Sequence, residues 1–159
     1  MAEHTTPSPA EPLVSVVVIN WNGKQHLPPC LDSLLAQTYP QVEILVADNA
    51  STDGSQQLVQ EQYPTVRLVA LPDNRGFTGG NNAGVAASTG QIVILLNNDT
   101  AVDPGWIATV VDAFHQHPDA GLVASKMLLF DRRDTFHTTG DFYRLDGLPG
   151  NRGVWQPDE

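Results

Sequence analysis

The sequence predicts an α/β domain in which helices cover both faces of a mainly parallel sheet. Short apolar runs alternate four times with segments of helical spacing, and the connections between them are short. That order is typical of right-handed strand–helix–strand crossovers, which build a parallel sheet. A chain of 159 residues with 41% hydrophobic residues can form one domain with a sizeable core. We therefore expect three layers, with the sheet in the middle.

Val-rich and Ile-rich runs mark the expected strands. The first run, LVSVVVIN at residues 13–20, is of the kind found in a strand that is covered on both faces. Similar runs at residues 42–49, 66–72 and 91–97 predict three more strands. Residues 120–128, AGLVASKML, are a candidate fifth strand.

Helical periodicity fills the intervals between these runs. Leucines between Leu27 and Leu35 recur at i, i+4, i+7 and i+8, which places them on one face of a helix. The two prolines that follow Leu27 suit its first turn, where a missing N–H costs little. We expect further helices at residues 55–63 and 80–88, and a last one with apolar residues at i, i+3, i+4 and i+7 from Ile107 to Phe114.

The ends of the chain differ from this pattern. Residues 1–12 are rich in Pro, Ser and Thr and are expected to form a disordered tail, without the features of a signal peptide. The α/β domain is expected over residues 13–128. Residues 129–159 show no clear period and are interpreted as a loop region or the start of an incomplete further part.

Composition excludes several classes of protein. The net charge of −10 argues against general nucleic-acid binding, which needs a basic face. No apolar run approaches the length of about 20 residues that spans a bilayer. Cys30 is the only cysteine, so the chain has no intrachain disulfide and a reducing, cytoplasmic compartment is expected.

Polar residues follow all four expected strands. Because ligands bind beyond the carboxyl ends of the strands in an open parallel sheet, these residues are expected to converge on one site. They are Asn20, Trp21 and Asn22 after the first strand, Asp48, Asn49 and Asp53 after the second, Asn74, Arg75, Gly76 and Asn81 after the third, and Asn97, Asn98 and Asp99 after the fourth.

Asp99 is the strongest candidate for a metal ligand. Mg²⁺ needs only one or two protein carboxylates when water and phosphate oxygens complete its shell. A plainer interpretation is that residues 98–100 cap the helix expected to begin near Pro104.

The other strand ends have plainer interpretations as well. Asp48 can accept hydrogen bonds from a nucleoside, or it can belong to an ordinary turn, and Asp53 can cap a helix. The glycines at residues 76–84 allow close approach of the backbone to a phosphate, and Arg75 can supply charge. Neither a G-x-G-x-x-G fingerprint nor a Walker A motif is present. Trp21 can stack on a base or pack within the protein.

Together, the segments VSVVVINWNG, VADNASTDGS, NRGFTGGNNAG and ILLNNDT resemble the nucleotide-sugar half of a family 2 glycosyltransferase. The resemblance covers residues 13–128 and implies the A-type glycosyltransferase fold, a Rossmann-like sheet that binds a nucleotide-diphosphate sugar. It implies that Asp48 contacts the base, that Asp53 lies near the nucleotide and that residues 74–76 approach nucleotide and sugar. Residues 97–99 occupy the Asp-x-Asp position, with Asp99 as ligand of Mg²⁺ or Mn²⁺ and Asn97 in place of the first acid.

The resemblance also implies an activity and partners. A family member transfers sugar to an acceptor hydroxyl with inversion of configuration. The motifs at residues 74–100 resemble those of members that transfer rhamnose or related sugars in bacterial cell-surface polysaccharides. The acceptor would be a glycan or a lipid-linked glycan, in the cytoplasm or at the inner face of the membrane, which leaves peripheral membrane association open. No general base is evident, since nothing singles out His137, Asp141 or Asp146. The catalytic base is therefore unassigned. The chain is interpreted as the N-terminal, donor-binding portion of a longer enzyme or as a truncated gene product, with residues 129–159 as the start of an incomplete acceptor-side region.

Two other functions fit the same residues. A nucleotide-sugar-binding module without catalysis would bind the donor but release no nucleoside diphosphate. A receiver-like signalling domain would also bind Mg²⁺ with clustered acids, although paired acids after the first strand and a late Lys after a strand are missing.

Overall fold

The computed structural model describes residues 11–146 and 148–158. The contacts divide the chain into two compact units, residues 1–111 and 112–159, which we describe separately. The division lies earlier than the boundary at residue 128 that the sequence suggests. Nearly all of the predicted tail, residues 1–10, lies outside the described residues.

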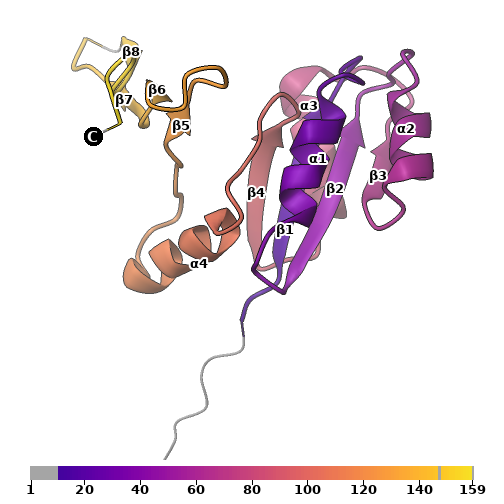
Figure 1. The fold of residues 1–159 in the computed structure, drawn as a ribbon, viewed down its shortest axis with the longest axis horizontal. Coiled ribbons are helices and arrows are strands. Elements are labelled where there is room, and N and C mark those ends of the chain that lie inside the picture. The colour runs from indigo at the N-terminus through magenta and orange to yellow at the C-terminus, as the bar shows by residue number, and fades with distance from the viewer. Residues whose placement is uncertain (1–10, 147, 159) are drawn as a thin grey trace, which may run out of the picture. The chain divides into compact units, whose positions relative to one another are not determined.

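The first unit contains a four-stranded sheet whose strands are all parallel, in the order β3-β2-β1-β4 (Figure 1). The strands are β1 (Val14–Asn20), β2 (Val42–Asp48), β3 (Arg67–Ala70) and β4 (Ile92–Asn97). Register is fixed along the centre, where Asn20 of β1 pairs with Asp48 of β2 and Ile19 pairs with Asn97 of β4. The predicted parallel α/β fold and its first four strands are confirmed.

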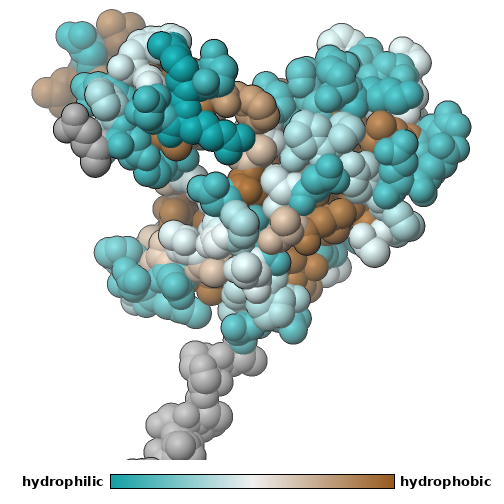
Figure 2. Space-filling view, viewed as in Figure 1, coloured by the Kyte–Doolittle hydropathy of each residue, from teal (hydrophilic) through white to brown (hydrophobic). Residues whose placement is uncertain are grey.

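Helices pack on both faces of this sheet. Side chains of α1 (Leu27–Leu35), α2 (Ser55–Gln62) and the first turns of α4 (Trp106–Gln116) form one core with alternate residues of β1, such as Val16 and Val18. On the other face, α3 (Gly76–Ala87) lies against β1 and β2, where Val17 and Leu45 are fully buried. Outer residues of α2 are polar and form a hydrophilic surface in Figure 2. The layering explains why β1 is apolar on both faces.

Two elements differ from expectation. The helix α3 begins at Gly76 instead of residue 80, because the glycines of this segment join the helix rather than a loop. The predicted fifth strand at residues 120–128 is wrong apart from Met127–Leu128. Its only large apolar residues before Met127 are Leu122 and Val123, and Leu122 is 94% exposed, so the run is too short to form a buried strand.

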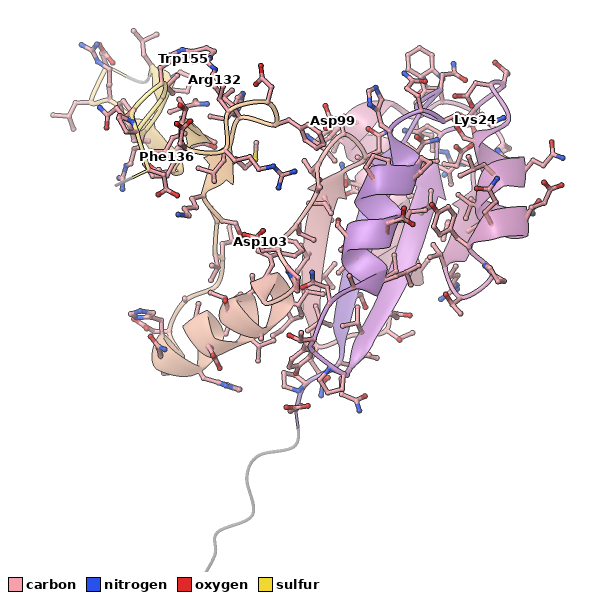
Figure 3. The ribbon with its side chains drawn as sticks, in the orientation of Figure 1. Lys24, Asp99, Asp103, Arg132, Phe136 and Trp155 are labelled. Atoms are coloured by element: carbon pink, nitrogen blue, oxygen red, sulfur yellow. The ribbon has the colours of Figure 1, made fainter. Side chains whose placement is uncertain are left out.

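The second unit contains two small antiparallel sheets instead of a structureless loop. The strand β5 (Met127–Leu128) pairs with β6 (Phe136–Thr138), and β7 (Asp141–Tyr143) pairs with β8 (Pro149–Asn151). An ion pair links the start and the end of this unit's strands, since Lys126 Nζ lies 2.6 Å from the carboxylate of Asp158. Arg132 lies over the ring of Trp155, 5.5 Å from its centroid (Figure 3). Among the described residues, no helix is long and apolar enough to cross a membrane.

A polar cluster ties the connection between α3 and β4 to the amino-terminal end of the sheet. The carboxylate of Glu43 accepts hydrogen bonds from the Ser15 hydroxyl and from both the N–H and the hydroxyl of Thr89. Partial burial raises the pKa of Glu43, but these hydrogen bonds and the nearby Arg67 guanidinium outweigh burial and hold the pKa below its usual value of 4.5.

We expect this cluster to make stability depend on pH. Because the pKa of Glu43 is lower in the folded chain, its contribution is complete above about pH 4.5 and is lost as pH falls through the folded-state value. Glu43→Gln should cost about 1 kcal/mol at pH 7 and less at pH 3. Urea unfolding at both pH values, on wild type and variant, measures the difference. An equal cost at both values would contradict the assignment.

Candidate functional site

A cleft of about 430 Å³ opens at the carboxyl end of the sheet. Residues that follow each of the four strands line it, those after β3 lying at the start of α3, so the segments after the strands converge as predicted. The lining residues are Ile19, Trp21, Asn49, Asn74, Gly76, Phe77, Asn97, Asn98 and Asp99.

Asp99 lies in the loop that follows β4 and is exposed at the cleft (Figure 3). The described part of the chain provides its carboxylate with no hydrogen bond or ion pair. The loop is held by its own contacts, because the Asn97 carbonyl accepts a hydrogen bond from the Thr100 hydroxyl at 2.7 Å and a longer one from the Cys30 thiol at 3.9 Å. Burial is the largest cause that raises the pKa of Cys30, to about 12, so this thiol is a neutral packing group.

Asn20 connects the end of β2 to the loop after β4. It is 1% exposed, and its amide nitrogen donates to Asp48 Oδ2 at 2.8 Å and to Ser51 Oγ at 3.2 Å. Its amide oxygen accepts a hydrogen bond from Asn98 Nδ2 at 2.7 Å. Asn20 therefore lies beneath the cleft instead of lining it.

Asp48 is fully buried, and both of its oxygens are used within the protein. Besides the bond from Asn20, Oδ1 accepts hydrogen bonds from the Ser51 N–H at 2.9 Å and from Gln56 Nε2 at 2.7 Å. It is absent from the lining of the cleft, so its geometry is that of a residue that organises the loops. The adjacent Asn49 lines the cleft instead.

Asp53 joins the loops that follow β1 and β2. One oxygen accepts a hydrogen bond from the Lys24 N–H at 2.8 Å, and the other accepts one from the Ser55 N–H at 3.0 Å, at the start of α2. Although burial raises its pKa, the hydrogen bonds from Ser55 and Lys24 outweigh burial and hold the pKa of Asp53 below its ordinary value. The plainer interpretation places a helix cap at residues 53–55, and the N-cap of α2 is Gly54, while Asp53 one residue earlier accepts the first N–H of the helix.

Trp21 and Asn22 follow Asn20 on the same loop. The Trp21 ring is 57% exposed and lines the cleft, whereas Asn22 has a left-handed backbone with φ of 49°. Asn22 accepts a hydrogen bond from the Thr52 N–H at 2.8 Å and donates its own N–H to Ser51 Oγ at 2.8 Å. Asn22 thus fixes the loop that presents Trp21.

The start of α3 forms another wall of the cleft. Asn74 Oδ1 accepts a hydrogen bond from the Gly76 N–H at 2.8 Å, and Gly76 has φ of +68°, which a residue without Cβ adopts easily. Asn49 Nδ2 donates to the Gly76 carbonyl at 3.0 Å, which ties this turn to β2. The Arg75 side chain is half-exposed and pairs with Asp73 at 3.4 Å, and it does not line the cleft.

Two further residues of this helix differ from the sequence interpretation. Asn81 is 4% exposed and lies inside the protein, where Nδ2 donates to the Phe77 carbonyl at 2.9 Å. Phe77, which the sequence analysis missed, is 65% exposed and lines the cleft. A large aromatic residue directly after the turn glycine Gly76 was the signal that could have identified it.

The cleft suits a divalent cation held by one carboxylate. Among the described residues, no group of three or more His, Cys, Asp or Glu side chains could hold a metal ion. Mg²⁺ and Mn²⁺ accept oxygen ligands, and with one or two carboxylates they rely on phosphate and water for the rest. Asp99 and the amides of Asn97 and Asn98 fit that type of site.

The order of the strands in the sheet also tests the receiver-like interpretation of the sequence. Receiver-like and flavodoxin-like domains have the order 2-1-3-4-5, in which the third strand neighbours the first. Here β1 lies between β2 and β4, and β3 lies at the edge beside β2. The receiver-like interpretation is therefore wrong.

Comparison with known proteins agrees with this geometry. Residues 15–154 match the sequence model of the family described as "Glycosyl transferase family 2". An uncharacterised glycosyltransferase of Nostoc sp. is 34% identical over 69% of this chain and 35% of its own length. The O-antigen biosynthesis protein RfbC of Myxococcus xanthus is 35% identical over 80% of this chain and 11% of its own length. The chain therefore spans only a small part of these relatives.

A solved structure shares the fold. The mannosyltransferase PcManGT of Pyrobaculum calidifontis, in complex with GDP-Man and Mn²⁺, has a TM-score of 0.61 and 28% sequence identity. The match covers 67% of this chain and 33% of that protein.

Proposed function

Because the chain belongs to glycosyl transferase family 2, we propose that its cleft binds a nucleotide-diphosphate sugar together with Mg²⁺ or Mn²⁺. The observation that carries this proposal is Asp99, an exposed carboxylate that has no hydrogen bond or ion pair within residues 11–146 and 148–158, among the lining residues of the cleft. The chain would supply the donor-binding part of an inverting glycosyltransferase.

Different residues of the cleft would bind different parts of the donor. Asp99 would hold the cation, which neutralises the charge that grows on the leaving diphosphate and contributes several kcal/mol in such sites. The exposed rings of Trp21 and Phe77 offer apolar surface to the base or to the sugar. The amides of Asn74 and Asn97 can donate to and accept from donor hydroxyl groups. We do not assign contact with the nucleobase to Asp48, because its carboxylate is buried and already accepts hydrogen bonds within the protein.

The acceptor hydroxyl would attack the sugar from the face opposite the diphosphate, which inverts the configuration. The proton of that hydroxyl needs a base, and Asp99 is the only carboxylate that lines the described cleft. We assign the base to none of the cleft residues. This observation keeps a second candidate function open, a module that binds donor without transferring sugar.

For the acceptor we propose a glycan or a lipid-linked glycan of a bacterial cell-surface polysaccharide. The relative from Myxococcus xanthus, an O-antigen biosynthesis protein, supports that class. A rhamnose-type donor sugar fits the resemblance of the motifs. With a lipid-linked acceptor, the reaction would take place in the cytoplasm at the inner face of the membrane.

A thermal-shift screen of nucleotide-diphosphate sugars with and without Mn²⁺ tests the proposal. We expect one donor at about 100 times its Kd to raise Tm by about 5–10 °C, only when Mn²⁺ is present. Asp99→Ala should remove the shift. Asp103→Ala, which changes an exposed acid outside the cleft (Figure 3), should keep it.

The outcome separates the candidates. Equal shifts in Asp99→Ala and wild type would remove Asp99 from the site. A metal-dependent shift without release of nucleoside diphosphate, when donor and acceptor are both added, would favour the non-catalytic module.

A further inference from the structure

We propose that Asp48, acting through Asn20, fixes the direction of the Asn98 side-chain amide so that its oxygen faces the cleft as a second protein ligand for the cation beside Asp99. The proposal rests on the proposed function, which supplies the cation. Asp48 and Asn20 would be positioning residues, because neither lines the cleft.

The direction starts at Asp48. A carboxylate has only acceptor oxygens, and those of Asp48 accept from Asn20, Ser51 and Gln56 in a fully buried position. A side-chain amide has a donor end and an acceptor end. Asn20 must therefore turn its nitrogen toward Asp48, and its oxygen faces away from it.

The same rule applies to the next amide. With its oxygen turned toward the loop after β4, Asn20 needs a donor there, and Asn98 Nδ2 provides one at 2.7 Å. Gly23 makes room for this contact, because a Cβ at that position would lie 2.1 Å from Asn98 Nδ2 and 2.7 Å from Asn20 Oδ1. The Asn98 nitrogen is thus held inward.

It follows that the Asn98 oxygen is turned away from Asn20. Asn98 lines the cleft next to Asp99, and the described part of the chain offers no hydrogen bond to its oxygen. Amide oxygens are good ligands for hard divalent cations but not for phosphate, which repels them. If the Asn98 amide were turned the other way, its NH₂ group would face the cleft, and the site would lose an oxygen ligand.

Asp48→Asn tests this relay without changing an atom that lines the cleft. An amide at position 48 can donate as well as accept, so Asn20 and Asn98 are no longer forced into one direction. We expect Mn²⁺ affinity to fall by about 10-fold, the lower end of the range for residues that orient metal ligands. Asn98→Ala, which removes the oxygen itself, should cause a similar loss.

Titration of the full chain with Mn²⁺ alone, with free Mn²⁺ measured by EPR, gives the affinities, and circular dichroism confirms folding. The relay predicts that Asp48→Asn has no further effect in the Asn98→Ala background, because its action passes through that side chain. A general structural role would add its own loss. Glu43→Gln, which changes a hydrogen-bonded carboxylate at the opposite end of the sheet, should leave Mn²⁺ affinity unchanged.

Unchanged affinity in Asp48→Asn, or effects that add in the double variant, would overturn the relay while leaving Asp99 as a ligand. Unchanged affinity in Asp99→Ala would overturn the metal site itself. Should Asp48→Asn fail to fold, Asn20→Ala is taken through the same cycle. Losses that add in the Asn20→Ala/Asn98→Ala double variant would count against the relay. A loss that Asn20→Ala causes in the wild-type chain but not in the Asn98→Ala variant would support it.

Discussion

Gly84→Leu is expected to destabilise the chain by about 3 kcal/mol or more, near the upper end of the range for overpacked cores. A Cβ on Gly84 would lie 2.2 Å from Val17 Cγ1 and 3.3 Å from the Cβ of Ala47. Val17 and Ala47 are fully buried in the sheet, so neither side chain can move aside. A leucine would force α3 away from β1 and β2.

The cost should exceed any gain from a better helix-forming residue. Replacing a helical glycine contributes at most about 1 kcal/mol through propensity. Ala86→Leu provides the matched control, because Ala86 lies on the exposed side of the same helix. Urea unfolding of the two variants separates contact with the sheet from helix propensity. Equal stabilities of Gly84→Leu and Ala86→Leu would show that α3 does not pack as described.

The close contact of α3 explains why the glycine-rich segment misled the sequence interpretation. Glycines at residues 76–84 suggest a loop that approaches a phosphate, and Gly76 does form a turn with φ of +68°. Gly80 and Gly84, however, bring a helix onto the sheet, since a Cβ on Gly80 would lie 2.2 Å from Ile19 Cδ1. Both roles require a missing side chain, so the sequence alone does not distinguish them.

The strand ends show a second limit. The run at residues 42–49 predicts the second strand, and in the structure β2 ends one residue earlier, at Asp48. Successive side chains of a strand point to opposite faces, so a shift of one position decides whether Asp48 or Asn49 reaches the cleft. The sequence favours the carboxylate for its chemistry, whereas the structure buries it beneath Asn20. The position of a polar cluster is predictable, but which member faces the ligand is not.

The second unit was harder still to predict. Its strands are three residues or shorter, which is too short for an alternating pattern to be visible. Contacts such as the 5.5 Å approach of Arg132 to Trp155 join residues far apart in the sequence. The long strands of the first unit can be predicted from the sequence, because a strand that is buried on both faces has to be apolar along its length.

Gly23→Ala is expected to weaken Mn²⁺ and donor binding by about 10-fold, as much as Asn98→Ala does, because both variants take the Asn98 oxygen away from the cation. The added Cβ would lie 2.1 Å from Asn98 Nδ2, so the Asn98 amide has to leave Asn20. The atoms that must move are the ends of two side chains, Asn98 at the cleft and Asn20 beneath it, rather than backbone in the core. Stability should therefore fall much less than in Gly84→Leu.

This separation of binding from stability distinguishes a positioned amide from a general packing defect. Gly105→Ala is the control, because a Cβ there meets nothing within 4 Å, and it should change neither Mn²⁺ affinity nor Tm. EPR titration with Mn²⁺ and thermal unfolding measure the two quantities on each variant. Wild-type Mn²⁺ affinity in Gly23→Ala would mean that the contact between Asn20 and Asn98 does not govern the cation. A large fall in Tm together with the loss of binding would instead assign Gly23 to the packing of the loops, since a displaced cleft side chain leaves the core intact.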